Sequence, residues 1–173
     1  MHSPAKKKAP FGTRTTAHVF VQRYQEGAWG PGRIEPAAPL ALAPLTHALH
    51  YGASIFEGFK AHRQPDGTLA LFRPLDHLRR LNRSAERMCL PQVDVDGLAR
   101  RIAELVRTDA SQAPSPPDAL YVRPLLFADG AVLGYATPTS ATLVVALVAV
   151  PALFKGGVRL RTETRFVRAA PGG

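Results

Sequence analysis

The chain has 173 residues, of which 46% are hydrophobic and 20% are charged, and its formal net charge is +9. This composition excludes intrinsic disorder as the main state, and the length leaves room for one domain or one and a half. The longest nearly apolar run, 143–154, is too short for a membrane-spanning helix, and the single cysteine, Cys89, excludes an internal disulfide or a thiolate metal cluster.

The positive charge is concentrated at the two ends of the chain. Residues 1–14 contain three lysines and one arginine without an acid, and residues 155–173 are also basic, whereas the segment between them is nearly neutral. This distribution argues against a nucleic-acid-binding surface. We expect residues 1–14 to be a flexible arm. A cytoplasmic location fits best, because the apolar segment of a secretory signal does not follow the lysines.

The first half of the chain is predicted to be mainly extended. Runs of branched and aromatic residues predict strands over 17–23, 56–62 and 68–73. The segment Gln64-Pro65-Asp66-Gly67 predicts a tight turn that joins the last two strands as a hairpin. Residues 27–32 are glycine-rich and predict a turn around Trp29. Three prolines within 36–45 predict an extended connector there.

Two helices follow the hairpin. Pro74 suits the first helical position, and apolar residues recur behind it at spacings of three and four, which predicts a core-facing stripe that ends before Pro91. The stripe comprises Leu75, Leu78, Leu81, Ala85 and Met88. A second helix is predicted over about 95–106, with Asp94 or Asp96 as its cap.

The remainder of the chain is predicted to form strands. Residues 120–127 and 142–150 are rich in branched side chains, and apolar residues alternate with arginines over 158–161, as in a half-buried strand. Two helices combined with several strands, joined by hairpins, indicate an α+β domain with a mainly antiparallel sheet.

Common chemical signatures are missing from the sequence. It contains no glycine-rich nucleotide loop, no G-x-S-x-G nucleophile and no metal-ligand spacing, and a structural role is the simplest interpretation of each of its six histidines. Function must therefore be inferred from longer stretches.

Three such stretches resemble one enzyme family in their order and spacing. They are His47–Lys60 (HALHYGASIFEGFK), Leu71–Ala85 (LFRPLDHLRRLNRSA) and Tyr121–Leu125 (YVRPL). Together they resemble the fold-type IV, class IV pyridoxal-phosphate-dependent aminotransferases, most closely the branched-chain amino acid aminotransferases. The resemblance runs from about residue 11 to 173 and implies the small N-terminal α+β domain of such an enzyme, a homodimer, and pyridoxal 5′-phosphate as cofactor.

The resemblance implies that Arg80 binds the phosphate of the cofactor. Arginine suits that role because its planar guanidinium forms two parallel hydrogen bonds with a phosphate. The alternative is that Arg79, Arg80 and Arg83 only form the solvated face of an amphipathic helix. Periodicity does not separate Arg80 from its neighbours, and only the resemblance selects it.

The resemblance also implies a set of substrate-binding residues. An aliphatic substrate needs an apolar pocket with polar groups placed for its carboxylate. The implied residues are Phe11, Tyr51 (reaching into the partner subunit), Phe56, Tyr121, Arg123, Leu133 and Tyr135. Single aromatic residues in strands are more often core residues, which is the alternative for Phe56, Tyr51 and Tyr121. A charge within an apolar strand, as at Arg123, is harder to explain by packing.

The lysine that forms the internal Schiff base in this family has no match in the chain. Residues 166–173 resemble the approach to it, and neither Lys60 nor Lys155 matches its position. We therefore expect residues 15–155 to be the substrate and dimer-interface domain and 156–173 to be a connector that begins the cofactor-binding domain. The chain alone is expected to be inactive.

The implied reaction is amino-group exchange between leucine, isoleucine or valine and 2-oxoglutarate. Two activities on the same fold remain as alternatives, D-amino acid transamination and aminodeoxychorismate lyase chemistry. A basic nucleic-acid-binding module without catalysis is a further alternative from a different class. The resemblance favours small-molecule amino acids and 2-oxo acids as partners, and neither a nucleic acid nor a membrane.

Overall fold

All eight strands of the computed structural model belong to one antiparallel sheet, and the structure describes residues 12–13, 15–154 and 156–166. The strands are β1 (Thr15–Gln25), β2 (Ala28–Trp29), β3 (Arg33–Pro36), β4 (Ser54–Phe56), β5 (Phe59–Arg63), β6 (Leu69–Leu71), β7 (Ala119–Ala128) and β8 (Ala141–Val150). Their order is β2-β1-β8-β7-β5-β6, with β3 paired to β1 and β4 paired to β7. The predicted α+β class is confirmed.

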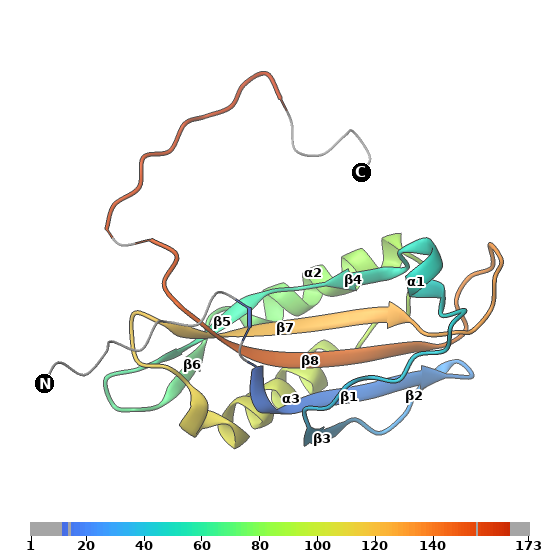
Figure 1. Ribbon diagram of the computed structural model, residues 1–173, viewed down its shortest axis with the longest axis horizontal. Helices are drawn as coiled ribbons and strands as arrows, with labels where there is room; N and C mark the ends of the chain where they lie inside the picture. Colours follow the sequence, from blue (N-terminus) through green and yellow to red (C-terminus); the bar gives the residue numbers. More distant parts are fainter. Residues whose placement is uncertain (1–11, 14, 155, 167–173) are drawn as a thin grey trace, which may run out of the picture.

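The two main helices cover one face of this sheet (Figure 1). They are α2 (Pro74–Arg87) and α3 (Val95–Thr108), and the short helices are α1 (His47–Tyr51) and the 3-10 helix η1 (Ala110–Gln112). Pro74 occupies the first turn of α2, as predicted, and Asp94 is the N-cap of α3, although its side chain makes no capping hydrogen bond. No helix in the described ranges is long and apolar enough to cross a membrane.

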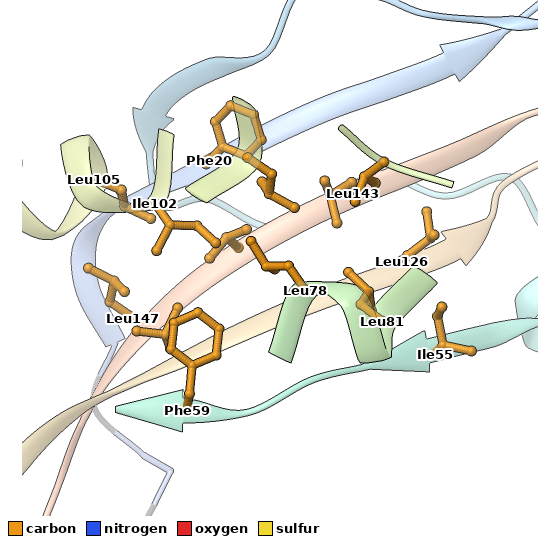
Figure 2. Close-up of a cluster of buried hydrophobic side chains, with 14 of the residues drawn as sticks. Phe20, Ile55, Phe59, Leu78, Leu81, Ile102, Leu105, Leu126, Leu143 and Leu147 are labelled. Atoms are coloured by element: carbon orange, nitrogen blue, oxygen red, sulfur yellow. The ribbon is translucent and has the colours of Figure 1, made fainter. Parts of the chain in front are cut away.

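The main hydrophobic core lies between the two helices and the sheet. Figure 2 shows side chains from α2 and α3 packed against side chains from the strands. Leu78 and Leu81 of α2 and Ile102 of α3 are fully buried, as the helical spacing predicts. Met88, predicted as part of the same stripe, is 40% exposed, because α2 ends at Arg87 and leaves Met88 as its C-cap.

Within the described ranges, the opposite face of the sheet carries no long helix, and many of its side chains are only partly buried. Along β7, Leu120, Val122 and Leu126 point into the core, so the alternate residues Tyr121 and Arg123 point to the other face. A small apolar cluster, Val21, Phe127 and Val144, lies on that face. We call it the helix-free face.

Two strand predictions need correction. The strand predicted over 56–62 is divided at Glu57 and Gly58, where the chain passes from β4 to β5. The strand predicted over 158–161 is wrong: these residues are irregular and exposed, and Leu160 is 91% exposed. Residues 156–166 run clear of the sheet in Figure 1, and an alternating pattern forms a strand only where a sheet edge can satisfy its backbone hydrogen bonds.

Candidate active site

Three of the implied site residues come together on the helix-free face. Phe56 of β4 pairs with Leu125 of β7, which places its ring on the same face as Tyr121 and Arg123. The guanidinium carbon of Arg123 lies 4.1 Å from the ring centre of Phe56 and 5.1 Å from that of Tyr121. Such stacking orients an arginine without neutralising its charge.

The break between β4 and β5 makes room for this cluster. A Cβ atom at Gly58 would overlap the hydroxyl of Tyr121, so a residue with a side chain cannot occupy this position without displacing Tyr121. The preceding amide, that of Glu57, donates a 2.9 Å hydrogen bond to the carbonyl of Pro124 and keeps the break against β7. The glycine therefore lets the Tyr121 side chain lie across the backbone.

Arg80 of α2 is bonded to the side chain of Glu57, which lies in the same break. Its Nε and Nη2 donate to the two carboxylate oxygens of Glu57 at 2.5 and 2.7 Å, although the residues are 23 positions apart. The Glu57 carboxylate also lies 3.2 Å from Nδ1 of His77, whose ring stacks on Phe59. The Glu57 side chain is 4% exposed, whereas that of Arg80 is 56% exposed.

The electrostatics of this group follow from its hydrogen bonds. Burial, the largest single influence, raises the pKa of Glu57, but bonds from Arg80, His77 and the Gly58 amide outweigh it together, and the pKa lies below its ordinary value. The hydrogen bonds and the charge of Glu57 raise the pKa of Arg80 in turn. At neutral pH both groups are ionised.

The structure distinguishes Arg80 from the neighbouring arginine that periodicity could not separate from it. Arg79 pairs with Asp76 at 3.2 Å on the exposed surface of the same helix. Arg80 instead reaches the buried carboxylate of Glu57, the residue that follows Phe56 in the chain. Within the described ranges, Nη1 of Arg80 has no hydrogen-bond partner. A half-exposed guanidinium with unused donors fits the phosphate that the resemblance implies.

A second group of implied residues lies at the end of β7, near α1. The rings of Tyr51 and Tyr135 are 5.7 Å apart, and His47 connects α1 to the same loop through a 2.8 Å contact with the carbonyl of Gly134. Leu133 is 55% exposed and Tyr135 is completely exposed. No described contact joins this group to Arg123 or Arg80, so the structure divides the implied residues into two groups.

Part of the implied site lies outside the described residues. Phe11 is in this part, and Lys155 and residues 167–173 are also outside the described ranges. Glu57, Gly58 and His77 were not assigned roles from the sequence. The signal that could have identified Glu57 is a carboxylate enclosed by aromatic residues in the run Phe56-Glu57-Gly58-Phe59.

Two hollows in the surface lie on other parts of the fold. One, of about 590 Å³, lies along β1–β3 and includes Arg23 and Arg33; the other, of about 320 Å³, lies between Trp29 and the start of α3. Neither contains an implied site residue. Within the described ranges no cluster of histidine, cysteine or acidic residues could hold a metal ion.

Several known proteins similar to this chain are named branched-chain-amino-acid transaminases or aminotransferases. The chain is 37% identical to the branched-chain-amino-acid transaminase 1 of Bacillus subtilis (strain 168) over 98% of its own length and 49% of that protein. It is 40% identical to the mitochondrial branched-chain-amino-acid aminotransferase of Bos taurus, over 98% of the chain and 46% of that protein. The chain therefore spans about half the length of these curated relatives. No protein-family model matches it.

Solved structures give the same fold. The branched-chain aminotransferase of Thermoproteus uzoniensis with norvaline matches 77% of this chain and 40% of its own, with a TM-score of 0.62 at 24% identity. A second branched-chain amino acid aminotransferase, solved with pyridoxamine 5′-phosphate, matches 78% of this chain and 41% of its own, with a TM-score of 0.59 at 27% identity. By sequence over nearly its whole length and by fold, the chain matches branched-chain amino acid aminotransferases and spans about half the length of such a protein.

Proposed function

We propose that this chain forms the phosphate-binding and substrate-side part of a transaminase that exchanges the amino group between leucine, isoleucine or valine and 2-oxoglutarate. The observation that carries the proposal is the pairing of two features around one strand break. An arginine stacked on two aromatic rings lies on the helix-free face, and a half-exposed arginine on α2 is held by a buried carboxylate from the adjacent strand break. The relatives with this name supply the reaction.

Arg80 is proposed to bind the phosphate of pyridoxal 5′-phosphate. Its Nε and one Nη2 hydrogen are used by Glu57, which leaves Nη1 for the ligand. When bound, this cofactor supplies the carbonyl carbon that accepts the amino group and the ring that withdraws electrons from the substrate. The residues of this chain bind and orient; they are not assigned a proton-transfer step.

Arg123 is proposed to bind the substrate carboxylate, and Phe56 to contact the aliphatic side chain. Arg123 makes no ion pair with any described acidic residue, so its charge is available to an anionic ligand. Phe56 is 59% exposed on the helix-free face and offers an apolar wall of the kind that leucine or valine needs. Tyr121 lies against Arg123, and Phe11 is proposed as a further pocket aromatic.

Tyr51, Leu133 and Tyr135 are proposed to act across a homodimer. All three are exposed and lie together at one end of the sheet, apart from the Arg123 cluster. Exposed apolar side chains at a sheet end are suited to a subunit contact.

A cytoplasmic location is also proposed. Among the relatives, one from Saccharomyces cerevisiae is named cytosolic, while others are named mitochondrial or chloroplastic.

Transamination measured on the whole protein that carries this chain tests the proposal. With pyridoxal 5′-phosphate and 2-oxoglutarate, L-leucine should be converted much faster than D-alanine. The variant Arg123→Met should raise KM for L-leucine at least tenfold, while Arg79→Met, on the exposed side of α2, should not change it. Equal rates with both amino acids would refute the proposed substrate class, and equal KM in both variants would refute the proposed role of Arg123.

A further inference from the structure

Glu57 is a buried carboxylate that the proposed function leaves without a role. Its side chain is 4% exposed and lies in the break between β4 and β5, with its amide bonded to β7. A buried charge is costly unless it is paired and hydrogen-bonded. The described hydrogen bonds of the carboxylate itself are with Arg80, His77 and the Gly58 amide, so its environment is organised around one exposed guanidinium.

The contact between Glu57 and Arg80 fixes the orientation of the guanidinium. Two parallel bonds through Nε and Nη2 define the plane of the group and direct the remaining edge, with Nη1, toward solvent. A free arginine side chain on a helix surface samples many rotamers, and binding a ligand would have to restrict them. A guanidinium held in advance avoids much of that entropic cost.

We propose that Glu57 is a positioning residue for Arg80, which holds one edge of the guanidinium so that the opposite edge receives a phosphate monoester. The inference rests on the proposed function, because it takes Arg80 as the phosphate ligand. Glu57 itself does not touch the ligand. It acts through Arg80, from the strand break that also places Gly58 under Tyr121.

His77 contributes to the same arrangement. Its Nδ1 lies 3.2 Å from the Glu57 carboxylate, and its ring lies nearly parallel to that of Phe59 with 5.0 Å between the ring centres. The same Nδ1 lies 3.3 Å from Nη2 of Arg80, so the imidazole contacts both members of the ion pair. The stacked ring thus limits the movement of Glu57, as Glu57 limits that of Arg80.

Electrostatic repulsion alone predicts the opposite effect of Glu57 on phosphate binding. A carboxylate close to a phosphate repels it, so removal of the Glu57 charge should tighten phosphate binding if repulsion dominates. Positioning predicts the reverse sign. The variant Glu57→Gln removes the charge and keeps the length, whereas Glu57→Asp keeps the charge and shortens the side chain by one methylene. Positioning predicts weaker phosphate binding in both variants.

The test compares pyridoxamine 5′-phosphate with pyridoxamine, which differ only in the phosphate, as ligands of the whole protein that carries this chain. The ratio of their dissociation constants isolates the phosphate contribution, and misfolded protein in a sample does not alter it. We expect the preference for the phosphorylated ligand to fall about tenfold in Glu57→Gln and in Glu57→Asp. The matched control is Asp76→Asn, which releases the exposed Arg79 and should leave the preference unchanged.

A second readout follows Arg80 directly. In the wild-type chain its Nε–H signal should be sharp and protected from exchange by Glu57, and Glu57→Gln should remove that protection. An unprotected signal in the wild-type chain, an unchanged preference in both Glu57 variants, or a tighter preference in Glu57→Gln would each overturn the positioning role. An unchanged preference in Arg80→Met would instead overturn the phosphate assignment in the proposed function.

Discussion

The two faces of the sheet differ in what their side chains do, although they belong to the same strands. The face under α2 and α3 is filled by aliphatic residues that are fully buried, such as Leu126 and Leu147. The helix-free face carries Arg123 and an exposed Phe56. Because side chains alternate along a strand, one strand can support the core with one residue and the site with the next. Along β7, core residues and site residues thus alternate one by one.

The largest expected effect is a loss of stability from the covered face. Leu78 is fully buried between α2 and the sheet, so Leu78→Ala should lower the free energy of unfolding by about 3 kcal/mol through lost burial and a cavity. Chemical denaturation measures the change. The matched variant on the other face is Phe56→Ala, which should cost less than about 1 kcal/mol because Phe56 is already 59% exposed. Equal losses would contradict the division between faces.

A smaller loss of stability is expected at Gly58, against which the Tyr121 side chain packs. Gly58→Ala should cost about 2 kcal/mol, because its new methyl group overlaps the Tyr121 hydroxyl and displaces that side chain. Thermal unfolding and the near-ultraviolet signal of the tyrosines report the two consequences. Gly134→Ala is the control, since its methyl group meets no described atom within 4 Å. A Gly58→Ala protein with unchanged stability would show that Tyr121 is not seated against the break.

The Glu57 carboxylate should make stability depend on pH. Its pKa in the folded chain lies below the ordinary 4.5, so its contribution is fully present above pH 4.5 and is lost as the pH falls through the folded value. Glu57→Gln should therefore lower the free energy of unfolding by about 1 kcal/mol at pH 7, since the exposed Arg80 partner is screened by solvent. The difference from wild type should shrink as the pH falls below 4.5. A difference that grows on acidification would contradict the lowered pKa of Glu57 in the folded chain.

The smallest effect on stability is expected in the segment 156–166, which lies outside the sheet. Leu160 is 91% exposed in an irregular segment, so Leu160→Ser should change the free energy of unfolding by less than about 0.5 kcal/mol. Chemical denaturation again measures it. A loss above about 1 kcal/mol would indicate that residues 158–161 pack as the half-buried strand that their alternation suggested.

The sequence predicted most of the elements because their signals are local. The apolar spacing after Pro74 was sufficient to identify α2, and the turn at Gln64–Gly67 correctly separated β5 from β6. The error at residues 158–161 arose because alternation reports a suitable pattern but not the presence of a neighbouring strand.

The site was less accessible from the sequence. Only the family resemblance selected Arg80, and Glu57 was not assigned a role because its contact with Arg80 spans 23 residues and exists only after α2 packs on the sheet. The gathering of Phe56, Tyr121 and Arg123 depends likewise on the register of β4 against β7, which no local pattern specifies.

The most direct test of the account is to locate where a phosphorylated ligand binds the chain. Titration of the isotope-labelled chain with pyridoxamine 5′-phosphate, followed residue by residue by NMR, should shift the signals of Glu57, Gly58 and Arg80 first, with smaller shifts at Tyr121. Shifts confined instead to the hollow between Trp29 and α3, or to the basic segment 156–166, would contradict the assignment of the site to the break between β4 and β5.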